Sequence, residues 1–184
     1  MMMPAAAVGT GGIADFDAVV ELYWPRVFRF ALASLRDRDA AQTVAQDCFW
    51  KAFNAREGFR GDAGIQTWLM QIAVNLIRDH ARDRRLRFWK RTRESAVDTA
   101  VAGRFLADGR PTPESAALAG ERVRAVWSAT ERLPERQRTV FLLRFVEDMD
   151  LLEIAAATGL KEGTVKAHLF RALHAVRDRI GEGR

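Results

Sequence analysis

The chain has 184 residues, a formal net charge of +5 and one cysteine, Cys48. A single cysteine excludes an intramolecular disulfide framework and any metal site built from several cysteines. Hydrophobic residues make up 48% of the chain and charged residues 29%, which is a globular composition and excludes wholesale disorder. No apolar run approaches the ~20 residues that span a bilayer, and residues 1–14 lack the positive start and apolar core of a signal peptide. We therefore expect a cytoplasmic protein without membrane insertion. Residues 1–14 are expected to form a disordered N-terminal tail.

Positive charge is concentrated in one stretch, residues 78–93, whose net charge of +6 exceeds that of the whole chain. A compact basic patch attracts a polyanion, and nucleic acid is the first candidate. A solvated basic helix end would carry the same pattern, so the charge alone leaves both interpretations open.

Apolar residues recur at helical spacing from Asp15 to about Trp89 and again from Gly120 to Ile180, without strand-like alternation. The intervening residues 92–119 are rich in small residues and contain Arg110-Pro111-Thr112-Pro113, which breaks helices. We predict an all-α fold with two small helical domains, residues 15–91 and 120–184, joined by a flexible linker at 92–119. Whether the two domains pack together stays open.

Three helices can be placed from their apolar spacing. The first helix contains residues 41–53 and leaves Trp50 on its polar side, where either a partner protein or its own domain can cover it. Its apolar face consists of Ala41, Val44, Ala45, Cys48, Phe49, Ala52 and Phe53. The second runs from about Thr67 to Phe88, follows a glycine-bearing loop at 59–66 and enters the basic stretch. Its predicted buried stripe consists of Trp68, Leu69, Ile72, Ala73, Leu76 and Ile77. The third spans about Glu162 to Arg179.

The segment Leu151–Leu169 has the spacing of a helix-turn-helix. Ala155 permits a close approach of the second helix, Gly159 suits the positive φ that ends the first, and Val165 anchors the second in the core. The second helix of this motif enters the major groove. The residues free to contact bases there are Lys161, Thr164, Lys166, Ala167, His168 and Arg171. A helical hairpin that only packs is the alternative for this segment.

Residues 133–177 resemble the minus-35-binding domain of bacterial sigma factors of the extracytoplasmic-function class. The matching pieces are Leu133–Arg138, Glu153-Ile154-Ala155 and Glu162–Lys166. Phe16 to about Arg87 resembles the other conserved sigma domain.

This resemblance implies a sigma factor that binds core RNA polymerase and directs promoter recognition, promoter melting and transcription initiation. Promoter DNA and an anti-sigma protein are the further partners that it implies. The helix containing Gln46–Phe53 stands where the family has its polymerase-clamp-binding helix. The implied polymerase-binding residues are Gln42, Thr43, Gln46, Asp47, Trp50 and Lys51. Gln42 and Thr43 replace an acidic pair of the family, and His168 replaces an arginine.

The helix containing Trp68–Asn75 resembles the one that reads and opens the minus-10 element. Opening a duplex requires aromatic platforms, positive grooves and pockets for flipped bases. Asn75 can hydrogen-bond a base edge, and the arginines can pair with phosphates. The predicted minus-10 and melting residues are Phe59, Arg60, Trp68, Gln71, Asn75, Arg78, Arg82, Arg84 and Arg85.

No catalytic constellation, cofactor motif or metal-ligand spacing is visible in the sequence. His80, His168 and His174 have no companion ligands at metal spacing, so we expect no enzyme, no cofactor and no metal. One alternative is a stand-alone helix-turn-helix regulator that binds DNA as a dimer without being a polymerase subunit. Another is a helical interaction module without a DNA role, which the basic stretch argues against.

Overall fold

The computed structural model describes residues 8–9, 12–13, 15–91 and 123–181, with side chains described only up to residue 83 in the first helical unit. The predicted linker at 92–119 lies outside these residues, as does most of the predicted tail. Within the tail, β1 (Val8–Gly9) and β2 (Gly12–Ile13) form a short antiparallel pair. Apart from this pair, the described elements are helices, and the all-α prediction is confirmed.

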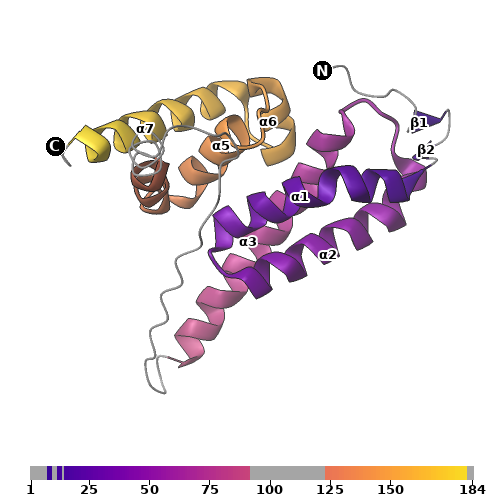
Figure 1. The fold of residues 1–184 in the computed structure, drawn as a ribbon, viewed down its shortest axis with the longest axis horizontal. Coiled ribbons are helices and arrows are strands. Elements are labelled where there is room, and N and C mark those ends of the chain that lie inside the picture. Colours follow the sequence, from indigo (N-terminus) through magenta and orange to yellow (C-terminus); the bar gives the residue numbers. More distant parts are fainter. Residues whose placement is uncertain (1–7, 10–11, 14, 92–122, 182–184) are drawn as a thin grey trace, which may run out of the picture.

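The first helical unit is a bundle of α1 (Phe16–Leu35), α2 (Arg38–Ala55) and α3 (Ile65–Arg91), with the 3-10 turn η2 (Arg56–Gly58) after α2 (Figure 1). The Asp15 carboxylate accepts a hydrogen bond from an N–H in the first turn of α1, and Asp37 does the same for α2. These caps satisfy donors that have no partner inside the helix. The bundle is closed by apolar side chains from all three helices, among them Phe30, Cys48 and Leu69.

The second unit begins with a helical segment at 123–131, followed by α5 (Glu135–Phe145), α6 (Leu151–Thr158) and α7 (Glu162–Gly181). Asp150 and Glu153 form a reciprocal capping box at the start of α6, which satisfies two free donors. The predicted turn is confirmed, because α6 ends at Gly159 with a φ of 69° and α7 begins at Glu162.

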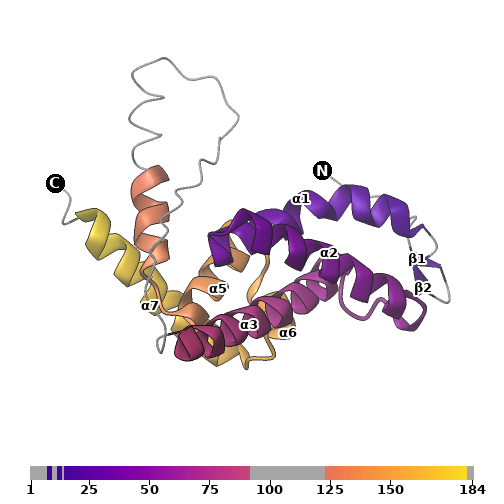
Figure 2. The same cartoon turned by 90° about the horizontal axis from the view of Figure 1, so that it is seen from below.

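The two units pack directly against each other, which answers the question that the sequence left open. α3 packs against α6, and α1 packs against α5; Figure 2 shows α3 running alongside the second unit. One continuous apolar cluster contains Phe30 and Met70 of the first unit together with Leu142 and Ile154 of the second. A separate, smaller cluster lies between α5, α7 and the 123–131 segment. The helix-turn-helix therefore shares its main core with the first unit.

Replacing Gly159 with alanine is expected to lower the free energy of unfolding by about 1 kcal/mol, because a β carbon is disfavoured in the left-handed region. Crowding is not the reason, since a β carbon there would meet nothing within 4 Å. Gly159→Asn should lose less, because asparagine tolerates this conformation. Chemical denaturation of the full chain measures all of these changes. Gly163→Ala is the matched control, since Gly163 has the same open space without a positive φ; equal losses at both glycines would contradict this explanation.

Candidate nucleic-acid and polymerase surfaces

The N-terminal half of α7 presents the predicted base-contacting residues on the surface. Lys161, Thr164, Lys166 and Arg171 are exposed, whereas Ala167 and His168 are partly covered. Lys166 forms an ion pair with Glu162 one turn earlier, at 2.6 Å. Val165, on the opposite side, is fully buried as predicted. This division leaves one edge of α7 free for a ligand.

His168 lies partly covered at this edge. Burial lowers the pKa of its imidazole, and the nearby positive charges of Arg171 and Arg136 lower it further. Its Nδ1 atom is buried and has no hydrogen-bond partner among the described residues. A neutral imidazole can donate or accept one hydrogen bond at a base edge, but it supplies no charge to a phosphate.

The polar face of α2 is fully open to solvent. The predicted polymerase-binding residues are all exposed: Gln42, Thr43, Gln46, Asp47, Trp50 and Lys51. The Trp50 side chain is 67% exposed, so its own domain does not cover it. Phe53 was predicted to lie in the buried stripe, but it is 45% exposed. It sits at the edge of that stripe, with its ring 5.4 Å from Phe16 and the Arg56 guanidinium over its face.

The loop before α3 holds an aromatic pair. The rings of Phe59 and Trp68 lie 4.8 Å apart at a tilted angle. Phe59 is buried and Trp68 is half-buried. Phe59 therefore packs against the Trp68 ring and is not itself accessible to a ligand. Arg60 is exposed in the same loop, where it pairs with Asp62.

The predicted minus-10 residues of α3 differ in their exposure. Gln71, Asn75 and Arg82 are exposed, and Arg82 is paired with Asp79. Arg78 is half-buried, and its guanidinium donates to the carbonyl oxygen of Thr158 at 3.1 Å. Arg84 and Arg85 belong to α3, but their side chains lie outside the described ones.

The α3 stripe also differs in its burial from the prediction. Leu69, Ala73 and Ile77 are buried as expected, while Trp68, Ile72 and Leu76 are only partly buried. Met70 and Val74, which the predicted stripe omitted, are buried completely or almost completely. The physical reason is that α3 is covered by the first unit and also by α6, so more than one stripe of the helix is removed from water.

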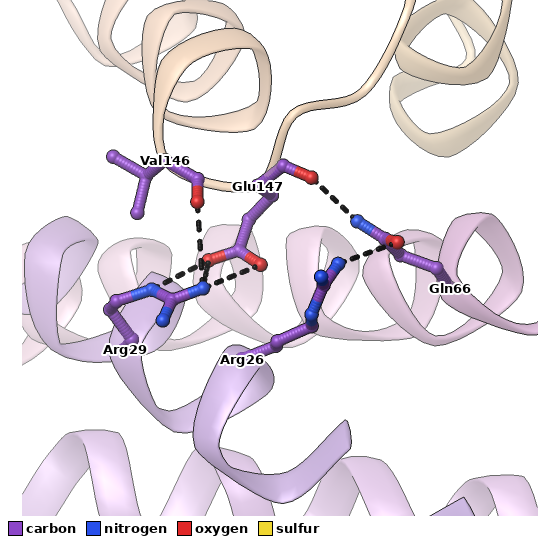
Figure 3. Close-up of polar contacts among 5 residues, drawn as sticks. All are labelled: Arg26, Arg29, Gln66, Val146 and Glu147. Carbon is purple, nitrogen blue, oxygen red and sulfur yellow. Dashed lines mark hydrogen bonds and ion pairs between the residues drawn. The ribbon is translucent and has the colours of Figure 1, made fainter. Parts of the chain in front are cut away.

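Sequence reasoning missed a polar cluster between the two units, which we call the Glu147 cluster: Arg26, Arg29, Gln66, Val146 and Glu147 (Figure 3). Arg29 donates from Nε and Nη2 to the two Glu147 oxygens at 3.1 and 3.2 Å, and from Nη2 to the Val146 carbonyl. Gln66 accepts from Arg26 and donates to the Glu147 carbonyl, both at 2.7 Å.

Glu147 lies in the loop between α5 and α6 and is 1% exposed. Burial raises the pKa of its carboxyl group, and the Arg29 guanidinium opposes that rise. Its partners come from α1 and from the start of α3. No local pattern signals them, because Arg29 precedes Glu147 by 118 residues.

Neither a metal-binding cluster nor a membrane-spanning helix is found among the described residues. No group of three or more histidine, cysteine or acidic side chains there could hold a metal ion. No helix in the described part of the chain is long and apolar enough to cross a membrane.

Both helical units match known families. Residues 19–87 match the model of sigma-70 region 2, and residues 123–176 match that of sigma-70, region 4. The RNA polymerase sigma-H factor of Pseudomonas aeruginosa is 34% identical over 173 residues, which cover 92% of this chain and 88% of that protein. The ECF RNA polymerase sigma-E factor of Escherichia coli K12 is 33% identical over 141 residues, covering 74% and 72%.

Solved structures share the fold. The sigma factor RpoE in complex with the anti-sigma factor NepR from Bartonella quintana matches with a TM-score of 0.75 and 21% identity, covering 94% of this chain and 100% of that one. CnrH in complex with the cytosolic domain of CnrY matches with a TM-score of 0.62 and 21% identity, covering 92% and 89%.

The chain belongs to the sigma-70 family, with a region 2 domain followed by a region 4 domain. Within that family it is a sigma factor of the extracytoplasmic-function (ECF) class, which acts with RNA polymerase in promoter recognition and initiation. A sigma factor is a regulatory subunit, and the alternative of a regulator that works without polymerase falls away.

Cys48 is expected to resist alkylation in the folded protein. It is buried in α2, its Sγ lies 3.5 Å from the Leu69 carbonyl oxygen, and burial raises its pKa to about 12. At pH 8 the thiol therefore stays protonated, and a thiol is a far weaker nucleophile than a thiolate. Mass spectrometry after iodoacetamide treatment should show no adduct on the native chain and one adduct on the denatured chain. Complete modification of the native chain within minutes would contradict the buried placement.

Proposed function

We propose that three separate helical surfaces of this sigma factor carry its three binding tasks. In this proposal α2 binds core RNA polymerase, α3 with its preceding loop reads and melts the minus-10 element, and α7 reads the minus-35 element. The observation that carries it is the exposure of a large aromatic, Trp50, on the polar face of α2, in the same chain as an exposed recognition helix.

The minus-35 role rests on the chemistry of α7. Lys166 and Arg171 are exposed cationic donors on the free edge of a helix-turn-helix, and such donors pair with guanine edges and phosphates. Thr164 lies two helical turns before Arg171 on the same side of α7, and its hydroxyl can donate to or accept from any base. His168 takes the place of a charged contact with a neutral ring, which favours a base edge over the backbone.

The minus-10 role rests on the exposed polar stripe of α3. Gln71 and Asn75 offer amides that can donate and accept at the Watson–Crick edge of an unstacked base. The half-buried Trp68 ring, supported by Phe59, offers a stacking surface of the kind that holds single strands. Arg82 and the basic end of α3 can neutralise phosphates, which makes binding salt-dependent.

The remaining partner assignments are proposals of the same kind. An anti-sigma protein is expected as a regulator, since one fold relative, the sigma factor RpoE from Bartonella quintana, is in complex with the anti-sigma factor NepR. The segment 92–119 is proposed as the linker that follows the polymerase surface between the two DNA elements. We place the action of the protein in the cytoplasm, without enzymatic activity of its own.

Run-off transcription tests the proposed function. Purified core RNA polymerase is incubated with a library of upstream DNA fragments, with and without this protein. Transcripts that begin at discrete sites only in its presence are the expected result. Sharp footprints by the protein alone, without any polymerase-dependent transcript, would contradict the proposal.

Lys166→Ala and Arg171→Ala are each expected to weaken transcription from a cognate promoter about tenfold or more, because a lost base contact costs ~1–3 kcal/mol. Arg177→Ala is the control, since Arg177 is an exposed arginine further along α7 and outside the predicted contacts. Run-off yield at limiting holoenzyme concentration measures the effect. Wild-type yield from both test variants would overturn the recognition-helix assignment.

Trp50→Ala is expected to weaken binding to core RNA polymerase about 30-fold, because an exposed tryptophan at the centre of an interface is often worth ~2 kcal/mol or more. Leu152→Ala serves as the control, because Leu152 is 66% exposed on α6, outside the proposed polymerase surface. Fluorescence anisotropy of labelled protein titrated with core enzyme measures both affinities. If the two variants bind equally well, α2 is not the polymerase surface.

A further inference from the structure

We propose that the Glu147 cluster is an intramolecular latch that seats the helix-turn-helix unit against the DNA-opening stripe of α3. In the free chain this arrangement occupies Arg78, one of the proposed minus-10 residues, while Gln71 and Asn75 stay exposed. This inference rests on the proposed minus-10 role of α3, but the latch itself is a separate, measurable contact.

The latch is built from side chains of both units. Glu147 projects from the α5–α6 loop toward α1, where Arg29 grips its carboxylate with two nitrogens (Figure 3). Gln66, at the start of α3, bridges Arg26 and the Glu147 backbone carbonyl. A single loop residue is therefore tied to two helices of the other unit.

Burial makes this contact decisive for the arrangement of the units. Glu147 has almost no solvent exposure, so its charge depends on Arg29 for compensation. Glu147 is the buried member of the pair, whereas the Arg29 side chain is 38% exposed. Losing Arg29 would therefore leave a buried charge uncompensated, which is more costly than losing an exposed pair. When the units separate, water solvates the Glu147 carboxylate and the Arg29 guanidinium. The latch therefore has two discrete states, one with the ion pair formed and one with both groups in water.

The closed state covers part of the proposed minus-10 stripe. Thr67 donates to Glu153 at 3.4 Å, and Arg78 donates to the Thr158 carbonyl at 3.1 Å. Thr67 and Arg78 are eleven positions apart, which is about three helical turns, so both lie on the side of α3 that faces α6. Gln71 and Asn75 fall between them along the helix and flank the covered stripe.

DNA and α6 therefore compete for the same side of α3. The guanidinium of Arg78 is occupied by a helix-end carbonyl in the closed state. A phosphate is a stronger partner for it, because both groups are then charged. A nucleic-acid phosphate that pairs with Arg78 would have to displace the end of α6, and opening the latch frees this guanidinium.

Glu147→Gln tests the latch, because it removes the charge and keeps the side-chain size. Glu131→Gln is the matched control: it makes the same charge change and breaks an exposed ion pair to Arg36 that also joins the two units. Spin labels on Glu21→Cys and Asp178→Cys, two exposed positions in different units, report the distance between them. The native Cys48 is buried and should stay unlabelled.

We expect one narrow distance in the wild type and in Glu131→Gln, and a broad, longer distribution in Glu147→Gln. Binding of a fluorescein-labelled single-stranded DNA 20-mer of mixed sequence should be about tenfold tighter for Glu147→Gln, since opening raises the binding-competent fraction. Glu131→Gln should bind like the wild type. Gln66→Ala removes the bridge between Arg26 and the Glu147 carbonyl without changing any charge, so it should open the chain to a smaller extent. Circular dichroism checks that every variant is folded.

Unchanged distances in folded Glu147→Gln and Gln66→Ala would overturn the latch. Equal gains in DNA affinity for Glu147→Gln and Glu131→Gln would overturn the blocking claim, because the gain would then come from charge alone. These outcomes concern the free chain. A failure of the proposed transcription function would instead appear in the run-off assay with core polymerase, whatever the distances are.

Discussion

The arrangement of this sigma factor depends on the burial of one carboxylate, that of Glu147, whose charge is compensated first by Arg29 and further by Arg26. A buried charge without a partner is costly, so the α5–α6 loop cannot take this place unless α1 is beneath it. The same placement of the second unit on the first also brings α3 against α6 and joins apolar side chains of both units in one cluster. Region 4 is therefore oriented on region 2 by side-chain contacts within the described chain.

A consequence of this arrangement is that α3 packs against two neighbours, the rest of the first bundle and α6. Its inner side closes the first bundle, which explains why Leu69 and Ala73 are fully buried. Its α6-facing side contributes Thr67 and Arg78 to the interface, and the adjacent exposed amides carry the proposed DNA contacts. By contrast, the polar face of α2 and the outer edge of α7 are free in the same conformation. The closed chain thus leaves the proposed polymerase and minus-35 surfaces accessible, whereas it occupies Arg78 of the proposed minus-10 surface.

Much of the local structure could be predicted from the sequence, because its causes are local. Gly159 ends α6 through its own backbone freedom, and Val165 is buried because of its place in the α7 stripe. The seating of the units could not be predicted, since it depends on a pairing between Arg29 and Glu147 across more than half of the chain. The burial of Val74 has the same origin, because a periodic stripe does not show that a helix will be covered from a second side. The residue-level roles in DNA and polymerase binding stay predictions.

The claim that α3 exchanges α6 for DNA can be tested most directly by measuring one distance in two states. Labels at Glu21→Cys and Asp178→Cys would be read by pulsed spin resonance in the free protein and in an initiation complex with core polymerase and promoter DNA. The account predicts a single narrow distance for the free protein and a clearly longer one for the complex that starts transcripts. An active initiation complex that keeps the distance of the free protein would contradict it.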